Sequence, residues 1–330
     1  MNINHLIHIR CPKTLRKLEL HDEVYENGKV KAGWLREPKS GNSYEIRNFI
    51  PRFVSPENYA ENFGLQWNIH NRTQYDDTSG AGITKERFEA ETKWEKDLSG
   101  QIILEAGSGS GRFTQHAANT NGFVITFDYS NAVEAVYKSN GHRDNVLVLQ
   151  ASIFEMPFEK NYFDKVFCFG VLQHTPDPKL AFMLLIEMLK KGGKIACDIY
   201  IKNITHWVFG TKYYVRPFIK NIEPQKLYSL VERYVNFIWP LARLISKIPK
   251  IGYAINWRLL VADYSTILPG ATSDQLKEWA ILDTFDMLSP RYDLPVTVAT
   301  FRSWHKEANL KEIDVHKGYN GVEGRGTKPL

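Results

Sequence analysis

The chain has 330 residues, and its 43% hydrophobic and 24% charged content is ordinary for a globular protein. A formal net charge of +5 is too small to indicate nucleic-acid binding by itself, so no nucleic-acid partner is expected. The three cysteines are scattered and suggest no disulfide framework, which indicates a reducing cytoplasm. The N-terminus lacks a signal pattern, and no run approaches the about 18 apolar residues of a membrane span.

Two segments precede the first motif. Residues 1–55 are expected to form a small separate module, a β-ribbon that packs through Leu18, Leu20, Trp34, Leu35 and Tyr44. Residues 56–99 are expected to be a helical lid or linker. Within it, Thr84–Leu98 is predicted to be an amphipathic helix with Phe88, Trp94 and Leu98 on its inner face.

A glycine-rich loop follows the first predicted core strand, Ile102–Glu105. Gly107, Gly109 and Gly111 alternate with serines after the acid that ends the strand. Glycines let the chain turn sharply and let a ligand approach the backbone. The helix predicted at 112–119 would direct free N–H groups toward that ligand. The pattern predicts a site for a nucleotide-like cofactor.

The spacing of the glycines narrows the cofactor. A dinucleotide fingerprint has glycines at its first, third and sixth places, whereas here they occupy the first, third and fifth, and Arg112 is sixth. The second strand, Val124–Asp128, ends in a carboxylate about twenty residues further on, which suits two ribose hydroxyls. NAD and S-adenosylmethionine both fit the acid, and the glycine register favours the second.

Strands and helices alternate through residues 100–200, which predicts right-handed crossovers and a parallel sheet. The remaining strands are expected at Val146–Gln150, Lys165–Phe169 and Lys194–Ile199, and the remaining helices at 131–140 and 178–190. Ligands of such sheets bind at the carboxyl ends of the strands.

The segment 201–290 is too long to be a simple crossover between two strands. It is expected to form a helical cap on the side of the site where the acceptor binds. Between 201 and 262 ten basic residues stand against two acids. A helix is predicted over Tyr228–Ser246, and the residues able to share one face are Leu227, Leu230, Val231, Tyr234, Val235, Ile238, Leu241 and Ile245. One interpretation is a cap that only covers the sheet. The other is a cap that also contacts an anionic membrane surface or a lipid-linked phosphate, at the inner face of the membrane.

Residues 291–330 are predicted to complete the core with a helix, Val296–Ala308, and two short strands, Leu310–His316 and Gly324–Pro329. An antiparallel hairpin at the end of a parallel sheet does not suit a Rossmann dehydrogenase.

Four ordered motifs resemble those of class I (type 11-like) S-adenosylmethionine-dependent methyltransferases. They are Glu105–Gly111, Phe127–Ser130, Val148–Phe158 and Phe163–His174, and Leu189–Ile195 resembles the turn into the family's fifth strand. The resemblance implies an α/β, Rossmann-like fold with a seven-stranded, mostly parallel sheet and a terminal antiparallel hairpin. It also implies S-adenosyl-L-methionine as cofactor and S-adenosyl-L-homocysteine as product, with in-line methyl transfer to a small-molecule, lipid-linked or glycan-linked acceptor.

The resemblance also implies a set of cofactor-binding residues. They are Gln66, Trp67, Glu105, Ala106, Gly107, Ser108, Gly109, Asp128, Tyr129, Ser130, Ser152, Ile153, Phe169 and Gly170. Ser152 departs from the family pattern, which usually has an acid at the adenine amino group. Trp67 and Gln66 could equally serve core packing.

The first module resembles the zinc-ribbon-like module that precedes some methyltransferase domains. Of the two Cys-x-x-Cys pairs only Cys11 remains, and Thr14, Glu37 and Ser40 stand where the other thiols would be. One thiol cannot form a tetrahedral site, so no zinc or other metal is expected.

His174 and Tyr292 are the predicted catalytic residues, although His174 could also be a loop histidine bonded to backbone. A histidine can take a proton at neutral pH. Tyr292 belongs to the segment Asp283–Asp293, which concentrates acids, an arginine and a tyrosine. Two other functions stay open, an NAD-dependent oxidoreductase and a non-catalytic binding partner that keeps the fold.

Overall fold

A seven-stranded sheet forms the centre of the molecule. The computed structural model describes residues 1–55, 58–80, 82–203, 210–268 and 270–330, so parts of the predicted segments 56–99 and 201–290 lie outside it. The strand order is β10-β11-β9-β8-β5-β6-β7. The strands are β5 (Ile102–Ala106), β6 (Phe123–Asp128), β7 (Val146–Gln150), β8 (Phe163–Cys168), β9 (Leu189–Ile199), β10 (Lys311–Gly318) and β11 (Gly321–Thr327).

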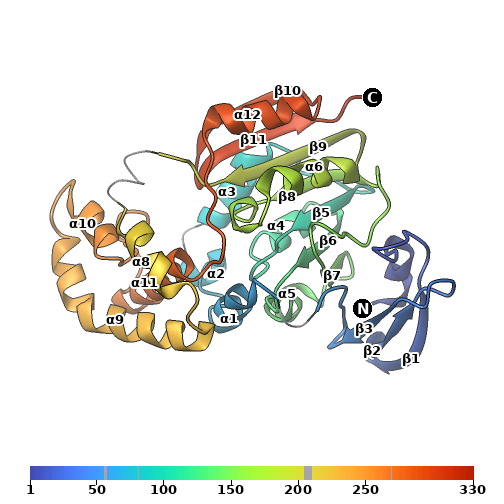
Figure 1. Ribbon diagram of the computed structural model, residues 1–330, viewed down its shortest axis with the longest axis horizontal. Coiled ribbons are helices and arrows are strands. Elements are labelled where there is room, and N and C mark those ends of the chain that lie inside the picture. Colours follow the sequence, from blue (N-terminus) through green and yellow to red (C-terminus); the bar gives the residue numbers. More distant parts are fainter. Residues whose placement is uncertain (56–57, 81, 204–209, 269) are drawn as a thin grey trace.

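Strand direction confirms the predicted fold class. The five strands from β7 to β9 pair in parallel, whereas β11 pairs antiparallel with both β9 and β10. The C-terminal hairpin therefore lies in the sheet, beside the last parallel strand, as the methyltransferase resemblance implies. Figure 1 shows β10 and β11 along one edge of the sheet.

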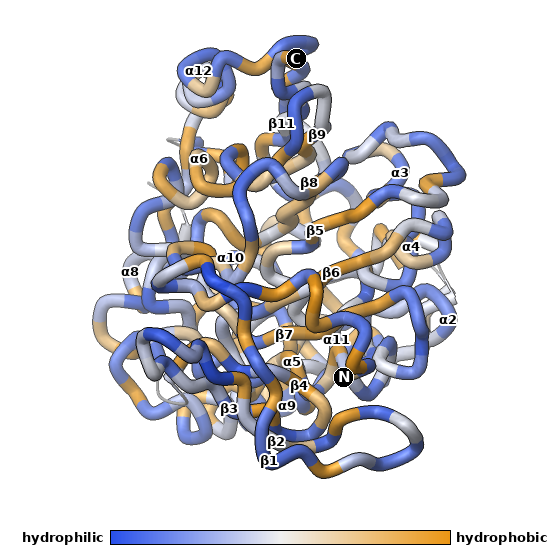
Figure 2. Tube along the Cα trace, turned by 90° about the vertical axis from the view of Figure 1, so that its right-hand side faces the viewer, coloured by the Kyte–Doolittle hydropathy of each residue, from blue (hydrophilic) through white to orange (hydrophobic). Residues whose placement is uncertain are grey.

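Helices cover both faces of this sheet because side chains along each strand alternate in direction. Ile103 and Val124 face one apolar cluster, while their neighbours Leu104 and Ile125 face the other. The helices that pack on strands are α3 (Ile83–Thr92), α4 (Thr114–Ala118), α5 (Val133–Asn140), α6 (Pro178–Met188) and α12 (Val298–Glu307). Apolar colouring runs along β5 and β6 in Figure 2, as expected for strands covered on both sides.

A second, four-stranded antiparallel sheet precedes the core, in the order β1-β2-β3-β4. Its elements are η1 (Ile3–His8), β1 (Glu19–Glu26), β2 (Lys29–Arg36), β3 (Ser43–Arg47) and β4 (Ile50–Pro51). After β4, the Phe53 amide donates to the Gln150 carbonyl at 2.8 Å. The N-terminal sheet is thereby attached to β7, the edge strand of the core, and shields part of that edge.

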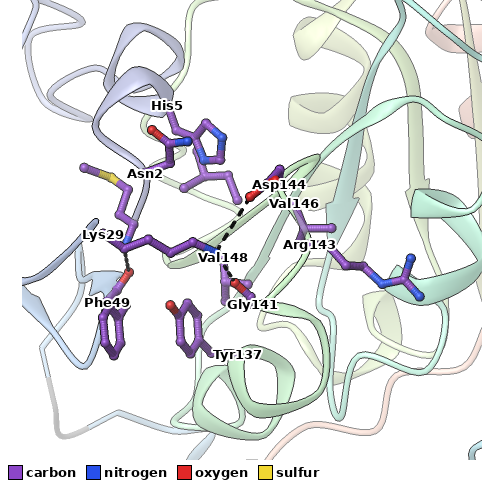
Figure 3. A pocket seen from close by; sticks show the side chains of 12 residues that line it. Asn2, His5, Lys29, Phe49, Tyr137, Gly141, Arg143, Asp144, Val146 and Val148 are labelled. Atoms are coloured by element: carbon purple, nitrogen blue, oxygen red, sulfur yellow. Dashed lines mark hydrogen bonds and ion pairs between the residues drawn. The ribbon is translucent and has the colours of Figure 1, made fainter. Parts of the chain in front are cut away.

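The joint between the N-terminal sheet and the core is tightly packed. Lys29 Nζ donates to the Gly141 carbonyl at 2.9 Å, and the cavity beside it, shown in Figure 3, has a volume of only about 10 Å³. Burial lowers the pKa of His5 in this joint to about 4, so its ring is neutral at pH 7. A space of this size holds about one water and no substrate.

In the described part of residues 201–290, four helices form the cap, which lies at the opposite end of the molecule from the N-terminal sheet (Figure 1). They are α8 (Thr211–Ile219), α9 (Pro224–Ile245), α10 (Gly252–Arg258) and α11 (Ser273–Leu288). Helix α9 packs on α11, and α1 (Glu61–Ile69) and α2 (Asp76–Ser79) precede α3 near the cap. None of the helices in the described ranges is long and apolar enough to cross a membrane.

The structure buries only part of the apolar face predicted for α9. Leu227, Val231 and Val235 are buried, but Leu230 and Leu241 are 53% and 52% exposed. The helix carries two apolar stripes, and only one of them packs against α11, because a neighbouring helix covers just part of a helix surface.

Several predicted helix ends also differ from the structure. The helix predicted over Thr84–Leu98 ends at Thr92, because Lys93 adopts a left-handed conformation with φ 49°. Trp94 and Leu98 still pack with Phe88, but from the chain beyond the helix. The short helix after the glycine loop spans only Thr114–Ala118.

Candidate active site

The glycine loop turns through left-handed backbone conformations at the end of β5. Gly107, Gly109 and Gly111 have φ values of 79°, 53° and 86°, a region that side chains disfavour. A Cβ at Gly107 would lie 2.3 Å from Cγ2 of Val171, the residue that follows β8 and Gly170. Gly107 and Gly109 stay partly accessible while Gly111 is buried, so the first two glycines leave backbone open to a ligand.

Asp128, at the end of β6, faces this loop. Its Oδ2 accepts a hydrogen bond from the Gly109 amide at 3.0 Å, and its Oδ1 accepts from the Ser130 amide and hydroxyl at 2.8 and 2.7 Å. Burial raises the pKa of the Asp128 carboxyl above its usual value, and these donors oppose the shift. The structure therefore brings together the two elements that the sequence predicts as partners.

Glu105 lies beneath the loop and is buried. Its Oε2 accepts from the hydroxyls of Thr114 and Thr126 at 2.5 and 2.7 Å, which ties β5 to α4 and β6. Burial raises the pKa of Glu105 to about 7. The neighbouring Ser108 hydroxyl is buried and has no partner among the described residues.

The two lid residues predicted on α1 point to different places. The Trp67 indole lies beside the loop, since a Cβ at Gly109 would be 3.2 Å from its Nε1. The Gln66 side chain instead donates to Asp286 of α11 at 3.0 Å, and its own carbonyl oxygen is buried without a partner in the described structure. Helix α1 thus connects the loop with the cap.

The other predicted cofactor residues follow the carboxyl ends of the parallel strands. Tyr129 and Ser152 stay partly accessible, whereas Ile153 is buried and Ala106 ends β5 in the core. Gly170 is partly accessible, and its amide donates to Asp198 of β9 at 2.5 Å.

Phe169 differs from the residues around it. Its ring packs on Phe113 and Phe167 at centroid distances of 5.3 Å each, inside the core. Only its backbone could contribute to a ligand site, because its side chain supports the sheet.

His174 and Tyr292 are adjacent, but through a backbone atom of Tyr292. The His174 Nδ1 donates to the Tyr292 carbonyl oxygen at 2.9 Å, while the Tyr292 ring packs edge-on to Tyr59. Burial lowers the pKa of His174, and Asp286 opposes that shift. The imidazole is therefore neutral at pH 7, with its proton on Nδ1 and its Nε2 available as an acceptor.

A polar cluster between the cap and the core joins two acids of the predicted segment Asp283–Asp293 to two tyrosines that the sequence did not single out. Tyr200, which follows β9, donates to Asp286 at 3.4 Å, and Tyr264 donates to Asp283. Burial raises the pKa of Asp283 to about 7. Arg112, at the sixth place of the glycine loop, has its pKa lowered to about 10 by burial. We call Tyr200, Tyr264, Asp283 and Asp286 the acceptor-side cluster.

A buried ionic group supports the loop after β8. Arg87 of α3 donates to Glu91 at 2.5 Å and also pairs with Asp198, whose other oxygen holds the Gly170 amide. Burial raises the pKa of Glu91 to about 8. No sequence pattern marked this group, because Asp198 is distant in the chain from Arg87 and Glu91.

The described residues contain no group of three or more His, Cys, Asp or Glu side chains that could hold a metal ion. In the N-terminal module, Cys11 Sγ lies 3.4 Å from the Tyr44 hydroxyl. The Glu37 carboxylate accepts from the amides of Lys39 and Ser40 at 2.9 Å each. Backbone donors therefore surround a carboxylate at one of the places where the resemblance puts a thiol.

Residues 104–197 match a family model described as a methyltransferase domain, whose cofactor is S-adenosyl-L-methionine. The demethylmenaquinone methyltransferase of Lactococcus lactis is 31% identical over 107 residues, which are 31% of this chain and 42% of that protein. Phosphoethanolamine N-methyltransferase 2 of Caenorhabditis elegans is 30% identical over 133 residues, 38% of this chain and 30% of that protein. The chain thus spans less than half the length of each of these two curated relatives.

A solved structure with a similar chain path is the complex between the Haloferax volcanii Trm112 methyltransferase activator and a methyltransferase. The match has 12% identity and a TM-score of 0.46, and it covers 81% of this chain and 98% of that chain. A similarity of this size gives no information about the activity or the partners of this chain.

Proposed function

We propose that this protein is an S-adenosyl-L-methionine-dependent methyltransferase that acts on a small-molecule acceptor, free or attached to a lipid or glycan. The observation that carries the proposal is the contact between Asp128 and the Gly109 amide at 3.0 Å, at the mouth of a loop whose first two glycines stay accessible. The acid at the end of β6 suits the ribose of a ligand, and the accessible backbone of the loop after β5 suits the amino-acid part of the same ligand.

The residues of the loop fit this cofactor. Asp128 would accept from a ribose hydroxyl, and the unpaired hydroxyl of buried Ser108 offers a donor beside the backbone of Gly107 and Gly109. Ser152 and Ile153 would flank the adenine, with Trp67 covering the loop. In this assignment residues 100–200 and 291–330 form the cofactor core, and residues 201–290 form the acceptor side.

When bound, the sulfonium supplies an already activated methyl group. The chain then has to hold an acceptor in line, exclude water and, for a protonated acceptor, remove a proton. We assign proton removal to His174 Nε2, because the Tyr292 carbonyl fixes the proton on Nδ1. The acceptor-side cluster offers carboxylates and phenols that would orient hydroxyl or amine groups of the acceptor.

Binding experiments test the cofactor assignment without knowledge of the acceptor. Calorimetric titration with S-adenosyl-L-homocysteine should show saturable binding, and fluorescence titration with NADH should show none. Binding of NADH alone would replace this proposal with an oxidoreductase. The glycine register and the antiparallel β10–β11 hairpin argue against that outcome.

A second experiment separates an enzyme from a binding partner. Incubation of the protein with methyl-labelled cofactor and a small-molecule extract should transfer label to an extractable product. The His174→Gln variant should bind S-adenosyl-L-homocysteine as the wild type does but transfer label at least tenfold more slowly. Unchanged transfer would remove His174 from catalysis, and no transfer by the wild type would favour the non-catalytic alternative.

A further inference from the structure

One surface of the cap is apolar and mostly exposed in the described structure. Along α9, an exposed stripe runs beside the buried one that contains Leu227 and Val235, and its spacing of three and four residues puts it on one helix face. The stripe continues past the end of α9 to the start of α10. We call it the outer cap face, and its residues are Leu230, Tyr234, Phe237, Leu241, Leu244, Ile248 and Ile251.

The exposure of these side chains is large. Phe237 is 87% exposed and Leu244 is 62% exposed, while Ile251 in the following turn is 55% exposed. Single exposed apolar residues are common on protein surfaces, but a contiguous row along one helix marks an interaction site.

Basic residues border the outer cap face. Lys226, Arg233, Lys247 and Lys250 are exposed and make no ion pair with any described residue. Glu232 is the one acid in the sequence from 224 to 251. By contrast, Lys212 of α8 lies inward and pairs with Asp293 at 2.9 Å. Its charge is therefore not available on the surface of the cap.

The turn after α9 concentrates both properties. Lys247 and Lys250 alternate there with Ile248 and Ile251, and all four side chains are exposed. Apolar side chains next to lysines suit a surface where a hydrocarbon layer lies beneath negative headgroups, because each lysine can keep its ammonium among the phosphates.

We propose that the outer cap face docks on the surface of a bilayer that contains anionic phospholipids, with α9 lying in the plane of the membrane. The apolar stripe would enter the headgroup boundary, and the bordering lysines and arginine would meet lipid phosphates. A second copy of this chain suits the face poorly, because a two-fold contact would bring the same unpaired positive charges together.

The position of this face gives it a relation to the candidate active site. Helix α11 packs on α9 through Phe285 and also carries Asp283 and Asp286 of the acceptor-side cluster. A membrane beneath α9 would therefore lie next to the acceptor side, which suits an acceptor attached to a lipid. This relation rests on the proposed function, whereas the docking itself does not.

Co-sedimentation of the full chain with vesicles tests the docking. The wild type should sediment with vesicles of phosphatidylcholine containing phosphatidylglycerol, should not sediment with phosphatidylcholine alone, and should be released by high salt. Each basic residue near such a surface strengthens binding about fivefold, so Lys247→Glu with Lys250→Glu should weaken binding at least tenfold. Phe237→Ser should weaken it to a similar extent by removing apolar contact.

Matched control variants lie on the C-terminal hairpin. Lys311→Glu with Lys317→Glu makes the same charge change at exposed positions of β10, and Tyr319→Ser removes a 60% exposed aromatic ring. Both controls should sediment as the wild type does. All variants should keep the wild-type affinity for S-adenosyl-L-homocysteine, which shows that they are folded and separates docking from the proposed function.

Three outcomes would overturn the proposal. The first is a wild type that does not bind anionic vesicles. The second is equal binding by the outer-face variants and the controls. The third is a wild-type dimer in light scattering that Phe237→Ser converts to a monomer without any vesicle binding, which would make this face an interface between copies.

Discussion

Replacing Asp128 with alanine should weaken the binding of S-adenosyl-L-homocysteine by about 10- to 150-fold. An ionised carboxylate offers about four acceptor positions, and Asp128 already uses three of them for Gly109 and Ser130. One position remains for the ribose, and a hydrogen bond to a charged group contributes about 1.5–3 kcal/mol. Calorimetric titration of wild type and variant measures the difference directly.

A matched control distinguishes ligand contact from loss of a local turn. Asp97 forms the same turn, with its Oδ1 accepting from the Ser99 amide and hydroxyl at 3.1 and 2.6 Å, but it lies exposed at the other end of the strands. Asp97→Ala should bind the ligand as the wild type does.

A ligand with fewer hydroxyls tests the same contact from the other side. The 2′-deoxy form of S-adenosyl-L-homocysteine should bind the wild type more weakly and should lose less affinity on Asp128→Ala, because the two changes remove one interaction. Wild-type affinity in Asp128→Ala, or additive losses, would refute the assignment of Asp128 to the ribose.

Three further changes concern stability and are measured by urea unfolding. Arg87→Met should lower the free energy of unfolding by about 3–5 kcal/mol because it leaves buried carboxylates unpaired, whereas Lys85→Met, in an exposed pair, should change it by less than about 0.5 kcal/mol. Gly107→Ala should destabilise more than Gly28→Ala, since both have positive φ but only the first places its Cβ against a neighbour; equal losses would contradict the clash. The pKa of Glu105 is raised from 4.5 to about 7, so the stability it contributes is present below pH 4.5 and lost as pH rises through 7. Relative to the wild type, Glu105→Gln should therefore gain about 3 kcal/mol between pH 4.5 and pH 7, and a pH-independent difference would contradict the raised pKa.

The sheet and the loop could be predicted because their signals are local. Alternating short apolar runs and helical segments define a parallel sheet, and its strand ends must share one edge. That edge places Asp128 opposite Gly109 without any knowledge of tertiary contacts, and the structure agrees. The C-terminal hairpin was predicted for the same reason, from two short strands after the last helix.

The cap could not be predicted to the same degree. Helix α9 is apolar over so much of its surface that periodicity alone does not show which stripe is buried. The contact with α11 decides it, by covering Leu227 and Val231 and leaving Leu230 and Phe237 exposed. The uncovered stripe is the surface for which we propose a membrane partner.

The acceptor-side cluster was predicted only in part, because the segment Asp283–Asp293 supplied its acids but nothing in the sequence pointed to Tyr200 and Tyr264. The first turns of α11 are partly exposed, but from Trp279 onward most side chains are buried, including Leu282 and Phe285. Asp283 and Asp286 lie in this inner part of the helix and are only partly accessible. Burying such groups is unfavourable unless they are hydrogen-bonded, and their partners come from distant parts of the chain, 220 residues away for Gln66. The signal in the sequence is thus an acid pair within the apolar C-terminal half of α11. Burial still raises the pKa of Asp283 to about 7, so its present hydrogen bonds do not fully offset the loss of water around the carboxylate. A hydroxyl or amine of an acceptor would supply a further hydrogen bond to it.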